Sequence, residues 1–299
     1  MSRTNIRDRA AGQVLISDGG WGTLLQERGL RTGECPELWC LRHPERVEAV
    51  AASYVEAGAE LIQTNSFGGN RYKLELYGLA GQTAEINRRA AELSRQAAGR
   101  QVLVLGSVGP TGKMLLMGEV DEDDLYAAFK EQAQALADGQ ADAICVETMS
   151  ALDEAALAIR AARENTDLEV VATFTFEKSA HSGEYRTMMG VTPAEAARGA
   201  LTAGADIVGS NCGNGFAGMV EIVRQMRGAI DPAVPILVHA NAGLPRLVDG
   251  REVFPESPQS MAGRLPALIA AGANIVGGCC GTTPAHVAAL KAARDADRR

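Results

Sequence analysis

Three cysteines could bind one metal ion together: Cys212, and the adjacent pair Cys279 and Cys280. Each follows a short apolar run typical of a strand, and thiolates are ligands that Zn²⁺ prefers. Neighbouring side chains on a regular strand point to opposite faces, so the pair can reach one ion only where the strand stops. Glycines on both sides of the pair allow such a break. Two alternatives remain open at this point, namely buried structural cysteines and a strained vicinal disulfide.

Three thiolates on Zn²⁺ leave the fourth position open and give the site a surplus negative charge. Such a site activates water poorly but holds a further thiol well, and it lowers the pKa of that thiol below the usual ~8.5. The surplus charge keeps the bound sulfur nucleophilic. The predicted chemistry is therefore alkyl transfer to a thiol rather than hydrolysis.

Two carboxylates predict a pocket for the charged ends of an amino acid. Glu147 closes an apolar run, and a buried carboxylate needs a cation, which a substrate ammonium or a neighbouring arginine would provide. Asp18 precedes Gly19 and Gly20, whose amides at a helix start could hold a substrate carboxylate. A tight turn with an N-capping aspartate is the alternative there. Asn241 could bind zinc in the resting state, orient a ligand, or hold its own loop.

Eight short apolar segments, separated by alanine-rich helical ones, must position these residues. Several of the segments follow a helix that ends on glycine, which is typical of a buried strand after a helix. Repeated units of this kind indicate parallel strands with right-handed crossovers. Eight units in 299 residues indicate an α/β fold, a (β/α)8 TIM barrel formed by a single domain over residues 1–299. The predicted strands are Val14–Asp18, Leu61–Asn65, Val102–Ser107, Ala143–Thr148, Val170–Phe176, Ile207–Asn211, Pro235–Asn241 and Asn274–Cys279.

A barrel of this kind carries its active site at the C-terminal ends of the strands. The candidate residues all lie at such ends, and so do Asn65 and Ser107, which we expect to contact the substrate. The Gly- and Pro-rich stretch Gly243–Pro258 is expected to be a long loop on the same face.

Charge and composition exclude several classes of protein. A net charge of −8 and a pI near 5.2 argue against binding to nucleic acid or to an anionic membrane. The N-terminus does not resemble a signal peptide, and no apolar run has membrane-spanning length. Six cysteines without secretory features favour a reducing, cytoplasmic setting and metal-binding or catalytic thiols.

As an ordered set, seven motifs resemble the zinc-dependent homocysteine S-methyltransferase family over essentially the whole chain. The resemblance is strongest to the homocysteine-binding module of cobalamin-dependent methionine synthase. The motifs are Asp18-Gly19-Gly20-Trp21-Gly22-Thr23, Thr64-Asn65-Ser66-Phe67, Gly106-Ser107-Val108-Gly109-Pro110, Glu147-Thr148, Asn211-Cys212-Gly213, Asn241-Ala242-Gly243 and Gly277-Gly278-Cys279-Cys280-Gly281-Thr282-Thr283-Pro284.

This resemblance implies a barrel with zinc on the three cysteines and homocysteine held by Asp18, Glu147 and nearby amides. It also implies Asn241 as a fourth ligand before the substrate arrives. Trp21 departs from the pattern, because relatives usually carry a smaller or flexible residue there. The indole could narrow the donor entrance, stack against a cationic donor, or pack against its helix.

The methyl donor is expected to arrive in trans. No histidine stands in the Asp-x-His-x-x-Gly run with which many corrinoid proteins supply an axial ligand, and the chain has no room for a folate barrel. The favoured donor is a separate methylcorrinoid protein, and a small donor such as S-methylmethionine or betaine is the alternative. A function of another kind is also possible for this sequence, namely a non-catalytic, zinc- or thiol-binding regulatory barrel. A redox sensor that uses the cysteine pair is a less favoured alternative. The acceptor could also be another short thiol or a selenol.

Overall fold

The computed structural model describes residues 5–248 and 251–297, and its centre is a parallel eight-stranded barrel. The predicted TIM barrel is therefore confirmed. The barrel strands are β1 (Leu15–Ile16), β2 (Leu61–Gln63), β3 (Leu103–Val108), β4 (Ala143–Met149), β5 (Glu169–Phe174), β8 (Ile207–Asn211), β9 (Ile236–Ala240) and β12 (Ile275–Gly278). They pair in the order β1-β12-β9-β8-β5-β4-β3-β2, and a parallel bridge from Ser17 to Leu61 joins the two ends.

Each predicted strand corresponds to one barrel strand, although several ends differ. The prediction for β8 matches the structure residue for residue. Strands β1 and β2 end earlier than predicted, at Ile16 and Gln63, because the chain leaves the ladder where it turns toward the site. Strand β9 lies between β8 and β12, so the strand that leads to Asn241 separates the two strands that lead to the cysteines.

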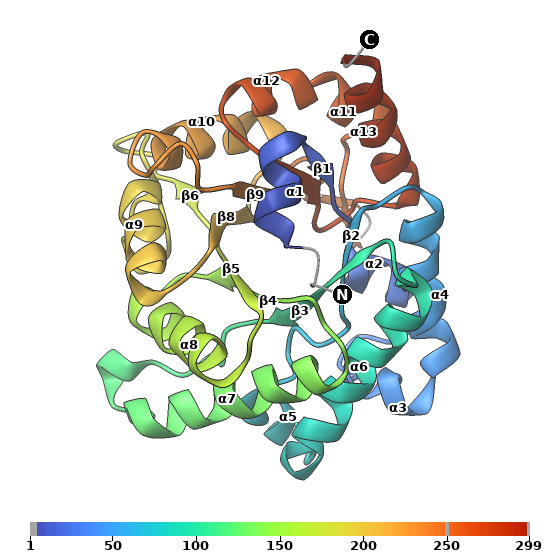
Figure 1. Ribbon diagram of the computed structural model, residues 1–299, viewed down its shortest axis with the longest axis vertical. Coiled ribbons are helices and arrows are strands. Elements are labelled where there is room, and N and C mark those ends of the chain that lie inside the picture. The colour runs from blue at the N-terminus through green and yellow to red at the C-terminus, as the bar shows by residue number, and fades with distance from the viewer. Residues whose placement is uncertain (1–4, 249–250, 298–299) are drawn as a thin grey trace.

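A ring of helices surrounds the barrel (Figure 1). The helices are α4 (Pro44–Glu56), α6 (Thr83–Ala98), α7 (Glu122–Asp138), α8 (Leu152–Asn165), α9 (Pro193–Ala203), α10 (Phe216–Arg227), α11 (Pro258–Gly263), α12 (Leu265–Ala270) and α13 (Pro284–Asp297). Their starts follow from the sequence: Thr192 and Glu195 form a reciprocal capping box before α9, with Pro193 at its first position. The Asp121 side chain accepts from the backbone N–H of Asp124 at the start of α7. Among the described residues, no helix is long and apolar enough to cross a bilayer.

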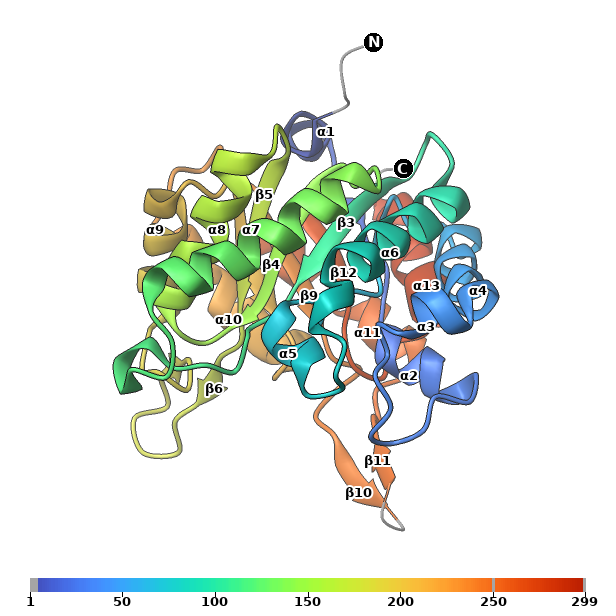
Figure 2. The same cartoon turned by 90° about the horizontal axis from the view of Figure 1, so that it is seen from below.

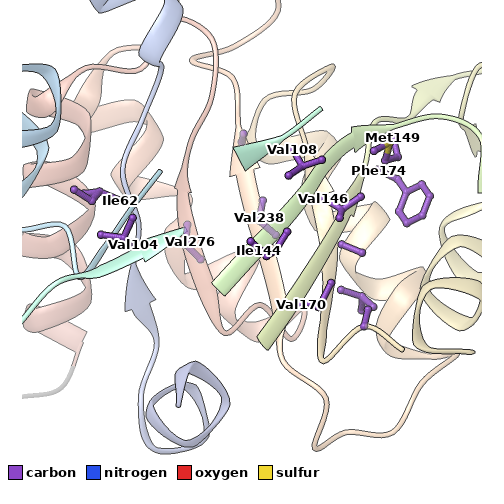
Figure 3. Packing of buried hydrophobic residues seen from close by; sticks show 14 of the residues in the cluster. Ile62, Val104, Val108, Ile144, Val146, Met149, Val170, Phe174, Val238 and Val276 are labelled. Carbon is purple, nitrogen blue, oxygen red and sulfur yellow. The ribbon is translucent and has the colours of Figure 1, made fainter. Parts of the chain in front are cut away.

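Two apolar clusters hold the barrel. Side chains that point outward from the strands, such as Ile62, Val104, Val146 and Val238, pack beneath the helices (Figure 3). Side chains that point inward form a second cluster within the barrel: Leu15, Leu61, Leu103, Leu105, Ala143, Cys145, Val171, Ile207, Leu237 and Ile275, together with Ile6 and Ala10. These last two belong to α1 (Ile6–Gly12), which therefore covers the N-terminal end of the barrel.

The opposite end carries the additional elements (Figure 2). They are α2 (Trp21–Glu27), α3 (Trp39–Arg42), α5 (Arg71–Glu75), short 3₁₀ turns at Ala80–Gln82 and Leu115–Met117, and the antiparallel hairpins of β6 (Glu177–Lys178) with β7 (Tyr185–Arg186) and β10 (Arg246–Val248) with β11 (Arg251–Val253). The last hairpin lies within the long loop predicted over Gly243–Pro258, and the segment does lie on the predicted face.

Candidate metal centre and substrate pocket

The sulfur atoms of Cys212, Cys279 and Cys280 all lie within 4.8 Å of one another. The Cys280 sulfur is 3.9 Å from each of the other two. Tetrahedral Zn²⁺ with bonds of ~2.3 Å to sulfur requires sulfur atoms about 3.8 Å apart, so the geometry fits this ion. A disulfide would need about 2.05 Å. All three cysteines are free and half-buried, which a replaceable fourth ligand requires.

The cysteine pair reaches one point because β12 ends immediately before it, at Gly278. The Cys279 N–H donates to the carbonyl oxygen of Ala240 at 2.7 Å, and the Cys280 N–H donates to Oδ1 of Asn241 at 3.1 Å. The next residue, Gly281, has φ of +77°, a left-handed conformation that favours glycine. The chain thus turns sharply, as the sequence predicted for two successive ligands.

Cys212 comes to the same point by a different turn. Its φ is +59° and that of Gly213 is +67°, so two successive left-handed residues bend the chain at the end of β8. The backbone N–H of Cys212 donates to the carbonyl oxygen of His239 at 2.9 Å. A non-glycine residue in this conformation costs about 1–2 kcal/mol, which indicates that the surrounding structure holds the thiol in place.

The three thiols form one hydrogen-bonded group. The neighbouring thiols of Cys279 and Cys280 lower the pKa of Cys212 to about 3, because they favour a thiolate there. The same contacts raise the pKa of Cys279 and of Cys280. Negative charge on sulfur is therefore stabilised at this point before any metal binds. Asn241, predicted as a resting-state ligand, lies beside the group and also helps to lower the pKa of Cys212.

Asp18 is fully buried at the mouth of the barrel, where its carboxylate accepts two short hydrogen bonds on one oxygen. Its Oδ2 accepts from the indole Nε1 of Trp21 at 2.7 Å and from the backbone N–H of Gln63 at 2.7 Å. Burial, with a smaller effect from the nearby charge of Glu147, raises the pKa of Asp18 from 3.8 to about 7, against the effect of these hydrogen bonds.

Glu147 is arranged in the same way. Its Oε1 accepts from the hydroxyl of Ser107 and from the side-chain amide of Gln63, the latter at 2.7 Å. Its Oε2 receives only a long contact, 3.4 Å from Nδ2 of Asn211. Burial raises the pKa of Glu147. Gln63 thus joins the two carboxylates, through its backbone to Asp18 and through its side chain to Glu147.

The two buried carboxylates have no basic side chain as a partner. Within residues 5–248 and 251–297, no arginine or lysine forms an ion pair with Asp18 or Glu147. Buried carboxylates are costly unless they are paired or protonated. Chemically, two such carboxylates can accept hydrogen bonds from a cationic group, and the Cys212 thiol is close enough to raise the pKa of Glu147.

The structure places two other predicted substrate contacts in structural roles. Asn65 is buried, and its amide donates to the carbonyl oxygen of Pro36 at 2.7 Å and lies 3.5 Å from the sulfur of Cys40. The N–H of Gly20 donates to the Thr282 hydroxyl at 2.9 Å.

Gly19 and Gly20 are needed for close packing. A Cβ on Gly19 would lie 2.7 Å from the hydroxyl oxygen of Thr282, and one on Gly20 would lie 2.7 Å from the carbonyl oxygen of Cys279. The first strand's loop is therefore pressed against the cysteine loop, which brings Asp18 near the thiols.

Gln63 is the site residue that the sequence interpretation missed, whereas Asn211 stood in the motif Asn211-Cys212-Gly213 without an assigned role. Asn211 ends β8 next to Cys212, and its Oδ1 accepts from the Thr148 N–H at 2.8 Å and from the Thr173 hydroxyl at 2.7 Å. Its place at a strand end was a usable signal. Gln63 gave none, because it stands within the predicted strand Leu61–Asn65.

Known proteins with sequences similar to this chain belong to the kind of family that this geometry suggests. The model of the family "Homocysteine S-methyltransferase" matches residues 15–294. Methionine synthase of Mycobacterium tuberculosis is 32% identical over 308 residues, which is 97% of this chain and 25% of that protein. Methionine synthase of Mycobacterium leprae is 32% identical over 309 residues, again 97% of this chain and 25% of the relative. The chain thus spans about a quarter of the length of these curated relatives.

A solved structure of a protein of comparable length has a similar fold. The metallated form of the homocysteine methyltransferase MmuM from Escherichia coli has a TM-score of 0.76 and 26% sequence identity, covering 94% of this chain and 96% of that one. The cysteine group, the carboxylate pair and the match over residues 15–294 lead to one conclusion: the chain belongs to the homocysteine S-methyltransferase family.

Proposed function

We propose that this barrel domain transfers a methyl group to the thiol of homocysteine and forms methionine, with Zn²⁺ as its cofactor. The observation that carries the proposal is that three convergent thiols and the buried carboxylates of Asp18 and Glu147 lie at the same end of the barrel, and that neither carboxylate has a basic partner. Homocysteine offers a thiol for the first group and an α-ammonium for the second. The free state of all six cysteines accords with a reducing cytoplasm.

Cys212, Cys279 and Cys280 would hold the ion. Bound there, Zn²⁺ supplies an open position for a thiol and lowers the pKa of that thiol. Asp18 and Glu147 accept the substrate ammonium, which fixes the homocysteine backbone at the barrel mouth. The homocysteine sulfur then attacks the methyl carbon, and the bond from that carbon to the donor breaks with its electron pair left on the donor. The thiol proton leaves to solvent.

We further propose that the donor is carried by a separate methylcorrinoid protein. The support is an apolar rim, which comprises all the large apolar side chains that the described part of the chain leaves exposed. Every member lies between a barrel strand and the helix after it, on the face that carries the site. The members are Phe67, Leu76, Tyr77, Met114, Leu116, Met117, Met188, Met189, Leu244, Leu247 and Val253. Exposed apolar side chains gathered on one face are typical of protein contacts.

A small-molecule donor, such as S-methylmethionine or betaine, is the second candidate. The observation in its favour is the match with MmuM, which covers nearly all of both chains. Turnover separates the candidates: zinc-loaded protein is incubated with homocysteine and with methylcobalamin, S-methylmethionine or betaine, and methionine is measured. Slow turnover with free methylcobalamin and none with the small donors supports a carrier protein. Fast turnover with a sulfonium or betaine contradicts it.

A rim variant sharpens this test. Leu116 is 80% exposed and lies in the segment between β3 and α7. Leu116→Glu should slow transfer from a methylcorrinoid protein and leave the slow transfer from free methylcobalamin unchanged. Glu122→Gln, an exposed change on the first turn of α7, is the control. No methionine from any donor, with zinc bound and homocysteine present, would favour the non-catalytic barrel instead.

A further inference from the structure

Trp21 makes a contact that an ordinary apolar residue could not make. It begins α2, and its indole N–H donates to Oδ2 of Asp18 at 2.7 Å. The same oxygen accepts from the backbone of Gln63 at 2.7 Å. The other oxygen, Oδ1, receives only a long contact of 3.4 Å from the hydroxyl of Ser17. One oxygen of Asp18 is therefore occupied by two donors, and the other keeps its capacity to accept.

Glu147 shows the same asymmetry. Its Oε1 accepts two hydrogen bonds, from Ser107 and Gln63, while its Oε2 has only the 3.4 Å contact to Asn211. Each carboxylate is thus held through one oxygen and leaves the other for a ligand. An ammonium has three N–H donors and would meet one open oxygen from each carboxylate.

We propose that Trp21 is a positioning residue, whose indole N–H fixes the Asp18 carboxylate so that Oδ1 accepts from the α-ammonium of the substrate. The inference rests on the proposed function, because it takes homocysteine as the ligand. Phe or Met at this position could fill the same space but has no N–H to donate. Without the indole bond, Oδ2 keeps only the Gln63 backbone donor, and the carboxylate gains freedom to rotate away from the substrate.

Packing is the competing role, since the Trp21 side chain is half-buried and also contacts the apolar core. The test must therefore remove the N–H and keep the shape. Replacement of Trp21 by 3-benzothienylalanine does this, because a sulfur atom stands where the indole has its N–H. Trp21→Phe is the encoded counterpart. Trp39→Phe is the control: Trp39 is buried, its ring packs edge-on against His43, and it makes none of the hydrogen bonds described for Asp18.

The ligand pair is homocysteine and 4-mercaptobutanoate, which is homocysteine without its amino group. Both Trp21 replacements should raise KM for homocysteine about 10-fold or more, the scale of one hydrogen bond to a charged group. They should change the inhibition constant of 4-mercaptobutanoate less than about 2-fold, and leave kcat and bound zinc unchanged. The Trp39 control should change none of these quantities.

An equal loss for both thiols would show that Trp21 only packs, and no loss for either would overturn the inference as well. Failure of the proposed function gives a different result: the wild-type protein itself would then discriminate no more than 2-fold between the two thiols. A loss confined to homocysteine, and shared by the isosteric replacement, supports the assigned role.

Discussion

Asp18→Asn is expected to make the protein more stable at neutral and alkaline pH, although it removes a site residue. Burial raises the pKa of Asp18 from 3.8 to about 7. Below pH ~3 the side chain is protonated in both the folded and the unfolded protein, and the substitution changes little. As the pH rises from about 4 to 7, the unfolded chain loses this proton freely while the folded protein holds it. The wild type therefore loses stability over this window, and the asparagine variant does not.

The magnitude follows from the size of the shift. A rise from 3.8 to about 7 corresponds to about 4 kcal/mol at pH 8. This is an upper value, because the asparagine amide must also be buried. The single oxygen of the asparagine side chain can take the place of Oδ2 of Asp18. It can then still accept from Trp21 and Gln63, so these two hydrogen bonds are retained. For a chain of this length the gain corresponds to a rise in Tm on the order of 10 °C.

The assay is urea unfolding of both proteins at pH 4, 5, 6, 7 and 8, without homocysteine and at one fixed zinc concentration. The difference in unfolding free energy should be small at pH 4, about 0.6 kcal/mol, grow through pH 6 and level off above pH 7. Asp138→Asn, an exposed carboxylate at the end of α7, controls for the loss of charge alone. A difference independent of pH, or a less stable variant at pH 8, would refute the reasoning. The same variant should bind homocysteine weakly, which would show that the site is maintained at the expense of stability.

Three further predictions concern the thiols, the second carboxylate and the barrel wall. Cys279→Ala should abolish zinc retention and methyl transfer. The circular dichroism spectrum should stay unchanged, because the residue follows the end of β12. Cys35→Ala is the control, and loss of the fold in the Cys279 variant would mean that the metal is structural. Glu147→Gln should weaken homocysteine binding about 10- to 100-fold in a calorimetric titration, and unchanged affinity would remove Glu147 from the site. Gly209→Ala should prevent folding or lower Tm strongly, because its Cβ would lie 1.9 Å from the carbonyl oxygen of Leu237. The control Gly22→Ala, with open space at its Cβ, should fold normally. Equal Tm values for the two variants would contradict the packing argument.

The barrel itself was predictable from the chain, because strand, turn and helix signals repeat at regular spacing and each rests on local residues. The thiol group was predictable for a related reason: parallel strands end on one face, so cysteines at the ends of β8 and β12 must approach each other. The strand order adds that Asn241 lies between them.

The carboxylate network was only half predictable. A charge at the end of an apolar strand marks Glu147, but its partner Gln63 has no such signal, because a glutamine in a strand can point to either face. The link between Trp21 and Asp18 depends on the turn through Gly19 and Gly20, which fits only because Thr282 and Cys279 pack against it. Contacts of this kind join residues more than 200 positions apart, and no local pattern encodes them.

Helix α1 has a consequence for the order of kinetic events. Ile6 and Ala10 join the inward-facing cluster and close the N-terminal end of the barrel, so the described chain offers the site one entrance. A carrier protein seated on the apolar rim would cover that entrance. Homocysteine must then enter before the carrier docks, and methionine must wait until the carrier leaves. Steady-state kinetics with a protein-borne donor should therefore be compulsory-ordered, with excess carrier inhibiting against homocysteine, whereas a small donor would allow either substrate to bind first.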